Sequence, residues 1–219
     1  MKYRIYQLLS LMFIVTSCTK DDEVLKKDVF YPLSVGNKWT YEIYNANNNL
    51  STEEQFFSVV KDTILISESE LYEAFIVETY TTSEDNYKWK IFQGHDSNSN
   101  LVQYGAQVQG ASIIDKSIQF RKNVKTGDSW NYNHLVYNEE DGIRSDVNEM
   151  ECIKLDTTIT TKAGTFTCIK YYDKFKRRES SNEKNLYYIN PEVGLIRYTL
   201  IYNGKVLIET SLKEYHIVD

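Results

Sequence analysis

Proline, histidine and long apolar runs are all scarce in this 219-residue sequence. It holds two prolines and three histidines, so few positions interrupt an extended chain and few can ligate a metal ion. No run approaches the roughly 20 apolar residues that a membrane-spanning helix needs. Basic residues are also in deficit, with 25 Lys and Arg against 31 Asp and Glu. This balance argues against binding to nucleic acid and against electrostatic docking on anionic lipids.

Recognisable catalytic motifs are absent as well. The chain lacks a G-x-S-x-G elbow, a G-x-x-x-x-G-K-[ST] phosphate loop and a G-x-G-x-x-G turn. Gly127-Asp128-Ser129 resembles the nucleophile block of GDSL-type esterases, but these need Asp-x-x-His late in the chain, and Lys213 precedes His216 by three residues. We therefore predict no enzymatic activity and no cofactor.

Metal-binding patterns are weak. His95, His134 and His216 lie far apart and lack ligand spacing. Residues 96–100 open like a calcium loop (D-x-N-x-N), but Leu and Gln stand where an EF-hand requires Gly and Glu at its sixth and twelfth positions. We predict no metal site, with an irregular calcium site at 96–100 or 139–141 as the alternative.

The N-terminus carries the strongest signal. Lys2 and Arg4 precede a mostly apolar run over 5–15, which has the size of a secretory signal and is too short to span a bilayer. Val15-Thr16-Ser17-Cys18 resembles a lipobox, in which small residues precede a lipid-accepting Cys. We predict that residues 1–17 are a cleaved signal peptide and that Cys18 is lipidated with acyl chains such as palmitate. The alternative is an ordinary signal peptide with a chance Cys at the cut.

Residues 18–29 are predicted to be the lipidated Cys followed by a flexible acidic tether. Lys20 and the acids at 21–23 resemble the signal that sends lipoproteins of Bacteroidota to the outer face of the outer membrane. We expect an outer-membrane protein exposed at the cell surface, with the periplasmic face as the alternative. Fully extended, the stretch 19–29 reaches about 36 Å. Without residues 1–17 the chain keeps 23 basic and 31 acidic residues, a net charge of −8.

Residues 30–219 are predicted to form one all-β domain, either a strongly curved antiparallel sheet or a barrel-like body. Tyr, Thr, Ile and Val are abundant, and short alternating runs are separated by turn clusters. Asn203-Gly204 between two such runs is the clearest hairpin signal. The predicted strands cover 39–44, 57–66, 72–80, 88–92, 148–155, 165–172, 186–189, 195–202 and 206–216.

The two halves of the domain share a pattern. G-polar-x-W-polar-Y occurs at 36–41 and again 91 residues later at 127–132. This predicts a tandem repeat over 30–120 and 121–219, unless turn chemistry recurs by accident. Trp39, Trp130 and Phe166 are predicted to lie in the core.

Three short motifs carry a family resemblance. PL-x-x-G-x-x-W-x-Y at 32–41, AGTF at 163–166 and P-x-VGLI at 191–196 resemble a group of uncharacterised envelope lipoproteins of the Bacteroidota type. The resemblance implies a β-rich extracytoplasmic domain and no catalytic residues.

Two cysteines remain after lipidation. If the turn lies at Ala163-Gly164, Cys168 lies opposite Ile159 and Cys152 is seven residues further along that strand, beyond disulfide reach. We therefore predict two buried thiols, with a bridge as the alternative. The basic cluster at 174–178 is predicted to be a solvated hairpin arm.

The expected function is that of a non-enzymatic binding or accessory module. Its N-terminal lipid would hold it at the membrane, and its partner would be a glycan, a peptide or an envelope protein. Tyr87 and Trp89 are the candidate contact residues. An alternative is a carrier of lipid or another apolar ligand, which requires an internal apolar cavity. A third hypothesis is an enzyme with an unrecognised pair of acids facing one cleft.

Overall fold

Antiparallel strands make up the described part of the protein. The computed structural model describes residues 30–46, 53–67, 70–82, 88–138, 140–174 and 182–218. The strands are β1 (Lys38–Asn45), β2 (Glu53–Ser67), β3 (Glu70–Thr81), β4 (Trp89–His95), β5 (Leu101–Val108), β6 (Ala111–Phe120), β7 (Ser129–Asn138), β8 (Gly142–Thr161), β9 (Gly164–Lys174), β10 (Glu183–Asn190), β11 (Gly194–Tyr202) and β12 (Lys205–His216).

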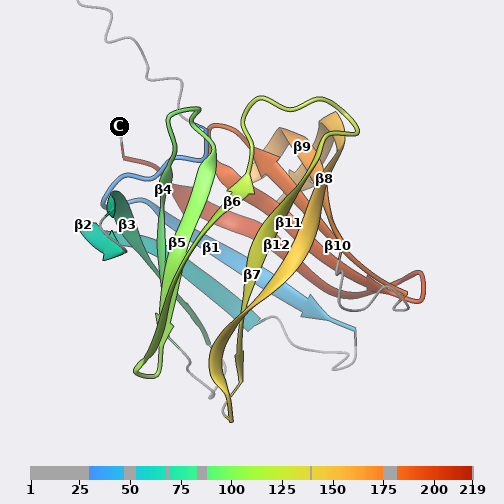
Figure 1. Cartoon of the computed structure of the whole chain (residues 1–219). Coiled ribbons are helices and arrows are strands. Elements are labelled where there is room, and N and C mark those ends of the chain that lie inside the picture. The colour runs from blue at the N-terminus through green and yellow to red at the C-terminus, as the bar shows by residue number, and fades with distance from the viewer. Residues whose placement is uncertain are drawn as a thin grey trace, which may run out of the picture.

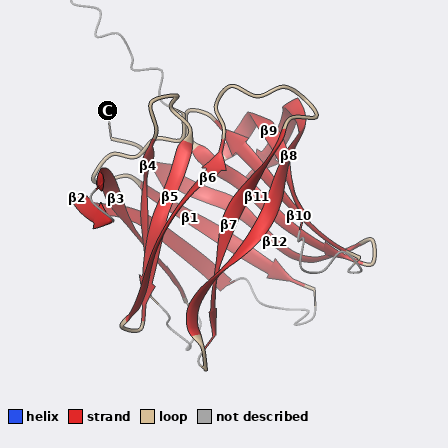
Figure 2. Cartoon of the chain, in the orientation of Figure 1, coloured by secondary structure: helices blue, strands red, loops and turns tan. Residues whose placement is uncertain are grey.

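All twelve strands belong to one sheet in the order β6-β5-β4-β3-β2-β1-β12-β11-β10-β9-β8-β7. The sheet curls until its two end strands, β6 and β7, face each other, giving a nearly closed barrel (Figure 1). The described chain contains strands and loops but no helix, so it also lacks a helix that could cross a membrane (Figure 2). The prediction of an all-β, barrel-like body is confirmed.

Local sequence explains most of these strands. Asn203 and Gly204 have φ angles of 50° and 76° and join β11 to β12, as predicted for a two-residue hairpin turn. β5, β6 and β7 were not among the predicted strands, and in β6 the pair Asp115-Lys116 breaks the apolar pattern. Asp115 bonds the Asn133 side chain across the closing edge, and Lys116 lies over the Tyr72 ring, so the two charged residues are held within a regular strand.

Each half of the chain forms a six-stranded meander, and the two halves begin with the same hydrogen bonds. The amide of Gly36 donates to Val59, and that of Gly127 donates to Cys152, at 2.9 and 2.8 Å. The return bonds run from the Val59 amide to Asn37 and from the Cys152 amide to Asp128, both 2.9 Å. Both glycines have positive φ (102° and 92°), which only glycine adopts without strain. The shared G-x-x-W pattern thus encodes a turn that starts each meander.

The two edge strands β6 and β7 are not joined by a backbone hydrogen-bond ladder. Hydrogen bonds that involve side chains hold them together instead. Here the Trp130 indole donates to the Ile118 carbonyl (3.0 Å), and the Gln119 amide donates to the Asn133 carbonyl (3.2 Å). The Asn133 amide in turn donates to the Ser117 hydroxyl at 2.7 Å. We call this line of contacts the seam. It leaves backbone groups of two edge strands without ladder partners, so it is the weakest line of the sheet.

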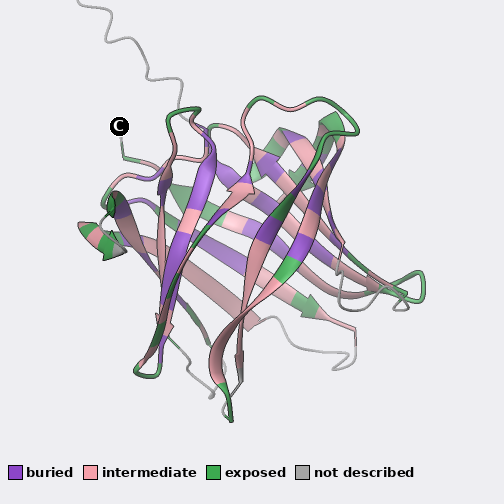
Figure 3. Ribbon diagram, in the orientation of Figure 1, coloured by how far each residue is buried: buried purple, intermediate pink, exposed green. Residues whose placement is uncertain are grey.

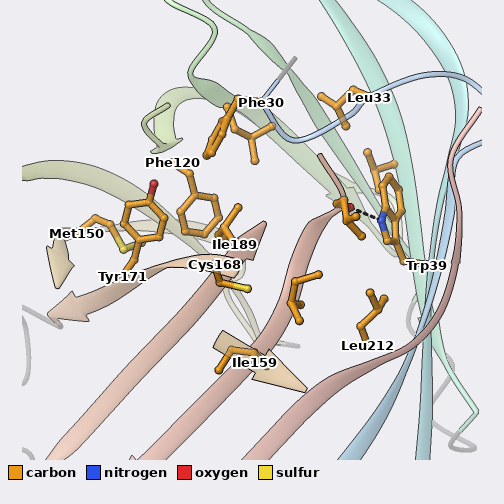
Figure 4. Packing of buried hydrophobic residues seen from close by; sticks show 14 of the residues in the cluster. Phe30, Leu33, Trp39, Phe120, Met150, Ile159, Cys168, Tyr171, Ile189 and Leu212 are labelled. Atoms are coloured by element: carbon orange, nitrogen blue, oxygen red, sulfur yellow. Dashed lines mark hydrogen bonds between the residues drawn. The ribbon is translucent and has the colours of Figure 1, made fainter. Parts of the chain in front are cut away.

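The apolar core fills the barrel near the end where the chain enters (Figures 3 and 4). Trp39 and Trp130 are buried there, as predicted, whereas Phe166 is only partly buried. The Trp39 indole donates to the Val193 carbonyl at 2.7 Å, which satisfies its buried N–H. At this end Phe30 is buried, and its carbonyl lies 2.7 Å from the His95 ring.

Candidate functional site

The inner face of β7–β10 carries a polar cluster beside the apolar core. Tyr132 of β7 lies opposite Asn148 of β8, and Asp173 of β9 lies opposite Asn185 of β10. Asp173 is also paired with the core residue Met150, so its side chain is on the inner face of the sheet. We call Tyr132, Asn148, Asp173, Asn185, Tyr187 and Tyr198 the Asp173 cluster.

Its central groups are buried and poorly satisfied. Asp173 and Asn148 are 0% exposed, and no well-formed hydrogen bond reaches either carboxylate oxygen, either amide atom or the Tyr132 hydroxyl, although the three groups lie close enough to affect one another's pKa or charge. A buried polar group without a partner costs about 1–3 kcal/mol, and a buried charge costs more. Such a cluster weakens the fold unless something else satisfies it.

Burial also changes the acidity of Asp173. Desolvation raises its pKa from 3.8 to about 6, while the nearby Tyr132 hydroxyl and Asn148 amide lower the pKa again in part. The charge of Glu183, which precedes Asn185 on the same face of β10, adds to the increase. Asp173 is therefore mostly ionised at neutral pH inside the protein, and no cation from the described residues is bonded to it.

Aromatic rings surround this acid. Tyr187 lies 5.1 Å from Tyr198 and 5.5 Å from Phe120, measured between ring centroids. The Tyr198 hydroxyl donates to the Asn185 side chain at 2.7 Å. Desolvation raises the pKa of the Tyr132 and Tyr187 hydroxyls well above the usual value, and the Asp173 charge raises both further. These hydroxyls stay protonated and remain hydrogen-bond donors.

The polar face continues along β7 and β8 away from the core. His134 pairs with Asp146 in the same register that places Tyr132 opposite Asn148. Desolvation lowers the pKa of His134, although Asp146 opposes that effect. Arg144 lies 3.7 Å from the Asp146 carboxylate. Acidic groups thus outnumber cations along this inner face.

Two hollows lie on the surface of the described chain, near the loop 121–128. The larger, of about 520 Å³, is lined by two lysines, two aspartates and apolar side chains: Lys122, Lys125, Asp128, Asp156, Leu155, Ile169 and Pro191 among them. The smaller, of about 330 Å³, includes Asp96, Asn100 and Arg121. Their charges are mixed, and several polar groups are already used for structure: an Asp128 oxygen accepts the Lys125 amide at 2.8 Å. Neither hollow selects a ligand by charge.

The loop 96–100 uses its acid for structure. Asp96 accepts the amides of Asn98 and Asn100 and the Asn100 side-chain amide, each at 2.9 Å. These three bonds give the Asp96 carboxylate a structural role within the loop. Across the described residues, no group of three or more His, Cys, Asp or Glu is placed to hold a metal ion.

The predicted site residues are not brought together. Cys18 and Tyr87 lie outside the described residues, as do most residues of the basic cluster 174–178. Trp89 is partly buried, faces Thr79 across β3 and contacts the Tyr137 ring edge-on, with centroids 6.2 Å apart. The role of Tyr87 and Trp89 in ligand contact stays a prediction.

Both remaining cysteines are buried and free. Cys152 lies opposite Tyr171, and Cys168 lies opposite Thr157, because the β8–β9 pairing is interrupted twice. The predicted pairing of Cys168 with Ile159 is therefore wrong by two residues. Desolvation raises the pKa of Cys168 to about 12, so its thiol is unreactive in the folded protein.

Sequence reasoning did not find the Asp173 cluster. Its members come from five strands, and their meeting depends on the register of four strand pairs. One signal was available: Asn148 and Asp173 each lie two residues from a core residue, Met150 and Tyr171, so the period of two places them on the inner face.

Comparisons with known proteins give two similar solved structures. A protein of Parabacteroides distasonis, named a putative lipoprotein, is 20% identical with a TM-score of 0.47. A protein of Bacteroides fragilis, named a putative exported protein with YmcC-like fold, is 12% identical with a TM-score of 0.45. Each alignment covers 86% of this chain and 99% of the other. The sequence matches no protein-family model and no curated protein.

Proposed function

We propose that this protein is a lipid-anchored, non-enzymatic binding module of the bacterial envelope, and that its barrel binds a ligand carrying a protonated amine. The observation that carries the proposal is Asp173, a fully buried carboxylate that faces only the neutral Tyr132 hydroxyl and Asn148 amide and has no cation bonded to it among the described residues. Buried charges in proteins are normally paired, because an unpaired charge loses its hydration without compensation. A ligand that brings the missing cation restores that balance.

The surroundings of Asp173 fit an amine in particular. Carboxylate, amide and hydroxyl oxygens can accept the three N–H groups of an ammonium ion. The rings of Tyr132, Tyr187 and Tyr198 provide faces that attract a cation. Asp173 and Glu183 give the cluster negative charge, and the cluster contains no lysine or arginine. Amino sugars, polyamines and basic peptide segments carry the required group.

Access to the cluster would come through the seam. Tyr132 neighbours Asn133, whose side-chain and backbone contacts with Ser117, Asp115 and Gln119 close the gap between β6 and β7. These are single side-chain hydrogen bonds, each with a net worth of about 1 kcal/mol. Opening the seam therefore costs less than separating any laddered pair of strands.

The inner wall favours a polar ligand over the alternative of a lipid carrier. A carrier needs an apolar cavity, whereas the apolar part of the described interior is occupied by packed core side chains. The neighbouring inner face presents Asp173, Asn148 and Asn185.

The anchor rests on the N-terminal sequence. The signal pattern over 1–17, the lipobox at 15–18 and the acidic residues after it support attachment through Cys18 at the outer membrane and exposure at the cell surface. Protease treatment of intact cells, compared between wild type and Cys18→Ala, tests this. We expect wild type to be membrane-bound and clipped, and Cys18→Ala to be lost from the membrane. Wild type that is bound but protected would place the protein on the periplasmic face.

Ligand binding is tested by thermal shift and calorimetry with spermidine and glucosamine, using glucose as the neutral comparison. We expect the amines to raise Tm at pH 7.5 and to lose this effect at pH 5, where Asp173 takes up a proton. Asp173→Asn should abolish the shift, whereas Asp156→Asn on the exposed hollow should retain it. Equal shifts for glucose and the amines, or for wild type and Asp173→Asn, would contradict the amine proposal.

A further inference from the structure

The tip of the β2–β3 hairpin presents an apolar surface to solvent. Ile64, Ile66 and Leu71 are 65%, 74% and 71% exposed. Ile66 pairs with Leu71, and Ile64 lies two residues before Ile66, so the three side chains share one face of the hairpin. We call these three residues the tip patch.

The other face of the same hairpin is packed. Leu65 and Tyr72, which pair with each other, contact a small cluster made of Ala74, Val102 and Tyr104. Tyr72 stacks on Tyr104 with centroids 4.8 Å apart. The hairpin is thus fixed on the barrel by one face, and the tip patch on its opposite face is held in an exposed position.

The matching hairpin of the second half does not leave such a patch. In β8–β9, Ile159 lies in the core at 8% exposure, and its partner Phe166 contacts the Tyr215 ring at 6.1 Å. The two meanders start with the same turn and the same hydrogen bonds, yet the first hairpin exposes its aliphatic residues far more than the second, where Leu155 is 37% exposed. Exposed Ile and Leu placed side by side mark a contact surface more often than a chance feature.

The tip patch lies beside the point where the chain enters the barrel. The Phe30 carbonyl contacts the His95 ring, and the preceding residue, Gly94, packs against the backbone of Glu73. Glu73 pairs with Ile64. Figure 1 shows the hairpin end of β2 and β3 on the same side of the barrel as the C-terminus. The lipid-accepting Cys18 lies within about 40 Å of Phe30 along the chain, at ~3.3 Å per residue.

We infer that the tip patch inserts into the bilayer that holds the Cys18 lipid, giving the anchored barrel a second membrane contact and a fixed orientation. This inference rests on the anchoring part of the proposed function. Three adjacent aliphatic side chains suit the headgroup–acyl boundary, because they are apolar and lie on one face. The tether is long enough to let the tip reach the membrane and is attached at the same end. The inner face of the barrel and the β11–β12 turn at Asn203-Gly204 would then point away from the bilayer.

The experiment uses the mature chain from Cys18 to Asp219, coupled through the Cys18 thiol to maleimide lipid in phosphatidylcholine vesicles. Buried Cys152 and Cys168 do not compete for the reagent. Chemical coupling keeps this test independent of whether cells lipidate Cys18, which protease treatment and fractionation measure separately. A tryptophan is placed on the tip by Ile66→Trp, and its quenching by brominated acyl chains is compared with the unsubstituted chain.

The matched control is Val206→Trp, which substitutes a 40% exposed residue next to the β11–β12 turn. We expect bromolipid to quench at least half of the added emission in Ile66→Trp and to leave that of Val206→Trp unchanged. Equal quenching at both positions, or none at either, would overturn the inference. A triple variant, Ile64→Ser with Ile66→Ser and Leu71→Ser, should keep the wild-type Tm without vesicles. If this variant instead dissociates an oligomer of the wild-type chain, the tip patch binds a second copy and the membrane role is wrong.

Discussion

Replacing Asp173 by Asn should stabilise the protein, and by an amount that depends on pH. The folded protein raises the pKa of this carboxyl from 3.8 to about 6, so the folded state binds its proton more tightly than the unfolded state. Below pH 3.8 both states are protonated and the shift has no effect. As pH rises from 3.8 to about 6 the wild type loses stability, because the unfolded chain gives up the proton first, and above about 6 the loss is complete.

The magnitude follows from the shift. About two pKa units at 1.36 kcal/mol each amount to about 3 kcal/mol of lost stability above pH 7. Asn has the same shape and no charge, and its amide can donate to the Asn148 side chain. At pH 7.5 we therefore expect Asp173→Asn to be more stable than wild type by about 3 kcal/mol, or about 6–12 °C in Tm for a domain of this size. At pH 4 the two proteins should differ little.

Urea unfolding followed by tryptophan fluorescence at pH 4 and pH 7.5 measures both values. Asp156→Asn, which removes an exposed acid, should change stability by less than about 0.5 kcal/mol at either pH. If Asp173→Asn is less stable than wild type at pH 7.5, the carboxylate is paired in the folded protein. Our description of the cluster as an uncompensated charge would then be wrong.

Three further predictions concern the framework. Gly105→Ala should lower the free energy of unfolding in urea by more than about 2 kcal/mol, because the added Cβ would lie 2.2 Å from a backbone oxygen and the residue has a φ of 149°. As a control, the Cβ of Gly110→Ala meets no atom within 4 Å, so this variant should lose only about 1–2 kcal/mol through backbone strain. Trp39→Phe leaves a buried carbonyl without its donor and should cost about 1–3 kcal/mol, measured in the same way; no change would mean that water replaces the indole. In the Cys18→Ala variant, Cys152 and Cys168 should react with Ellman's reagent at pH 8 only after urea is added, and rapid reaction of the folded protein would contradict their burial.

Local patterns predicted the fold well because each strand pairs mainly with its neighbours in the chain. The Asn203-Gly204 turn and the buried Trp39 and Trp130 could all be identified within short windows. Register was harder. The two interruptions of the β8–β9 pairing between Cys152 and Thr157 shift the partner of Cys168 by two residues from the predicted one. No residue type in that stretch indicates that the strand contains extra residues.

The Asp173 cluster depends on register as well, and its burial adds a second difficulty. Asp173 stands between Tyr172 and Lys174, where the sequence reads as the end of a strand beside a basic cluster. Its burial depends on the curvature of the sheet, which brings β7 and β10 to the same wall. Curvature arises from twist and bulges summed over many strands, so it is not encoded in any one of them.

The pairing of β1 with β12 has a consequence for how the protein is made. Across the sheet the strands run from β7 to β12 and then from β1 to β6. Neighbouring strands are therefore consecutive in the chain everywhere except at the β12–β1 pair. The Val218 amide donates to the Asn37 side chain at 2.8 Å, which places the segment after β12 beside the start of β1. Every other ladder joins two strands that are consecutive in the chain. The junction that unites the halves must wait for the final strand, so a chain that loses its last dozen residues would be left as two unjoined sheets.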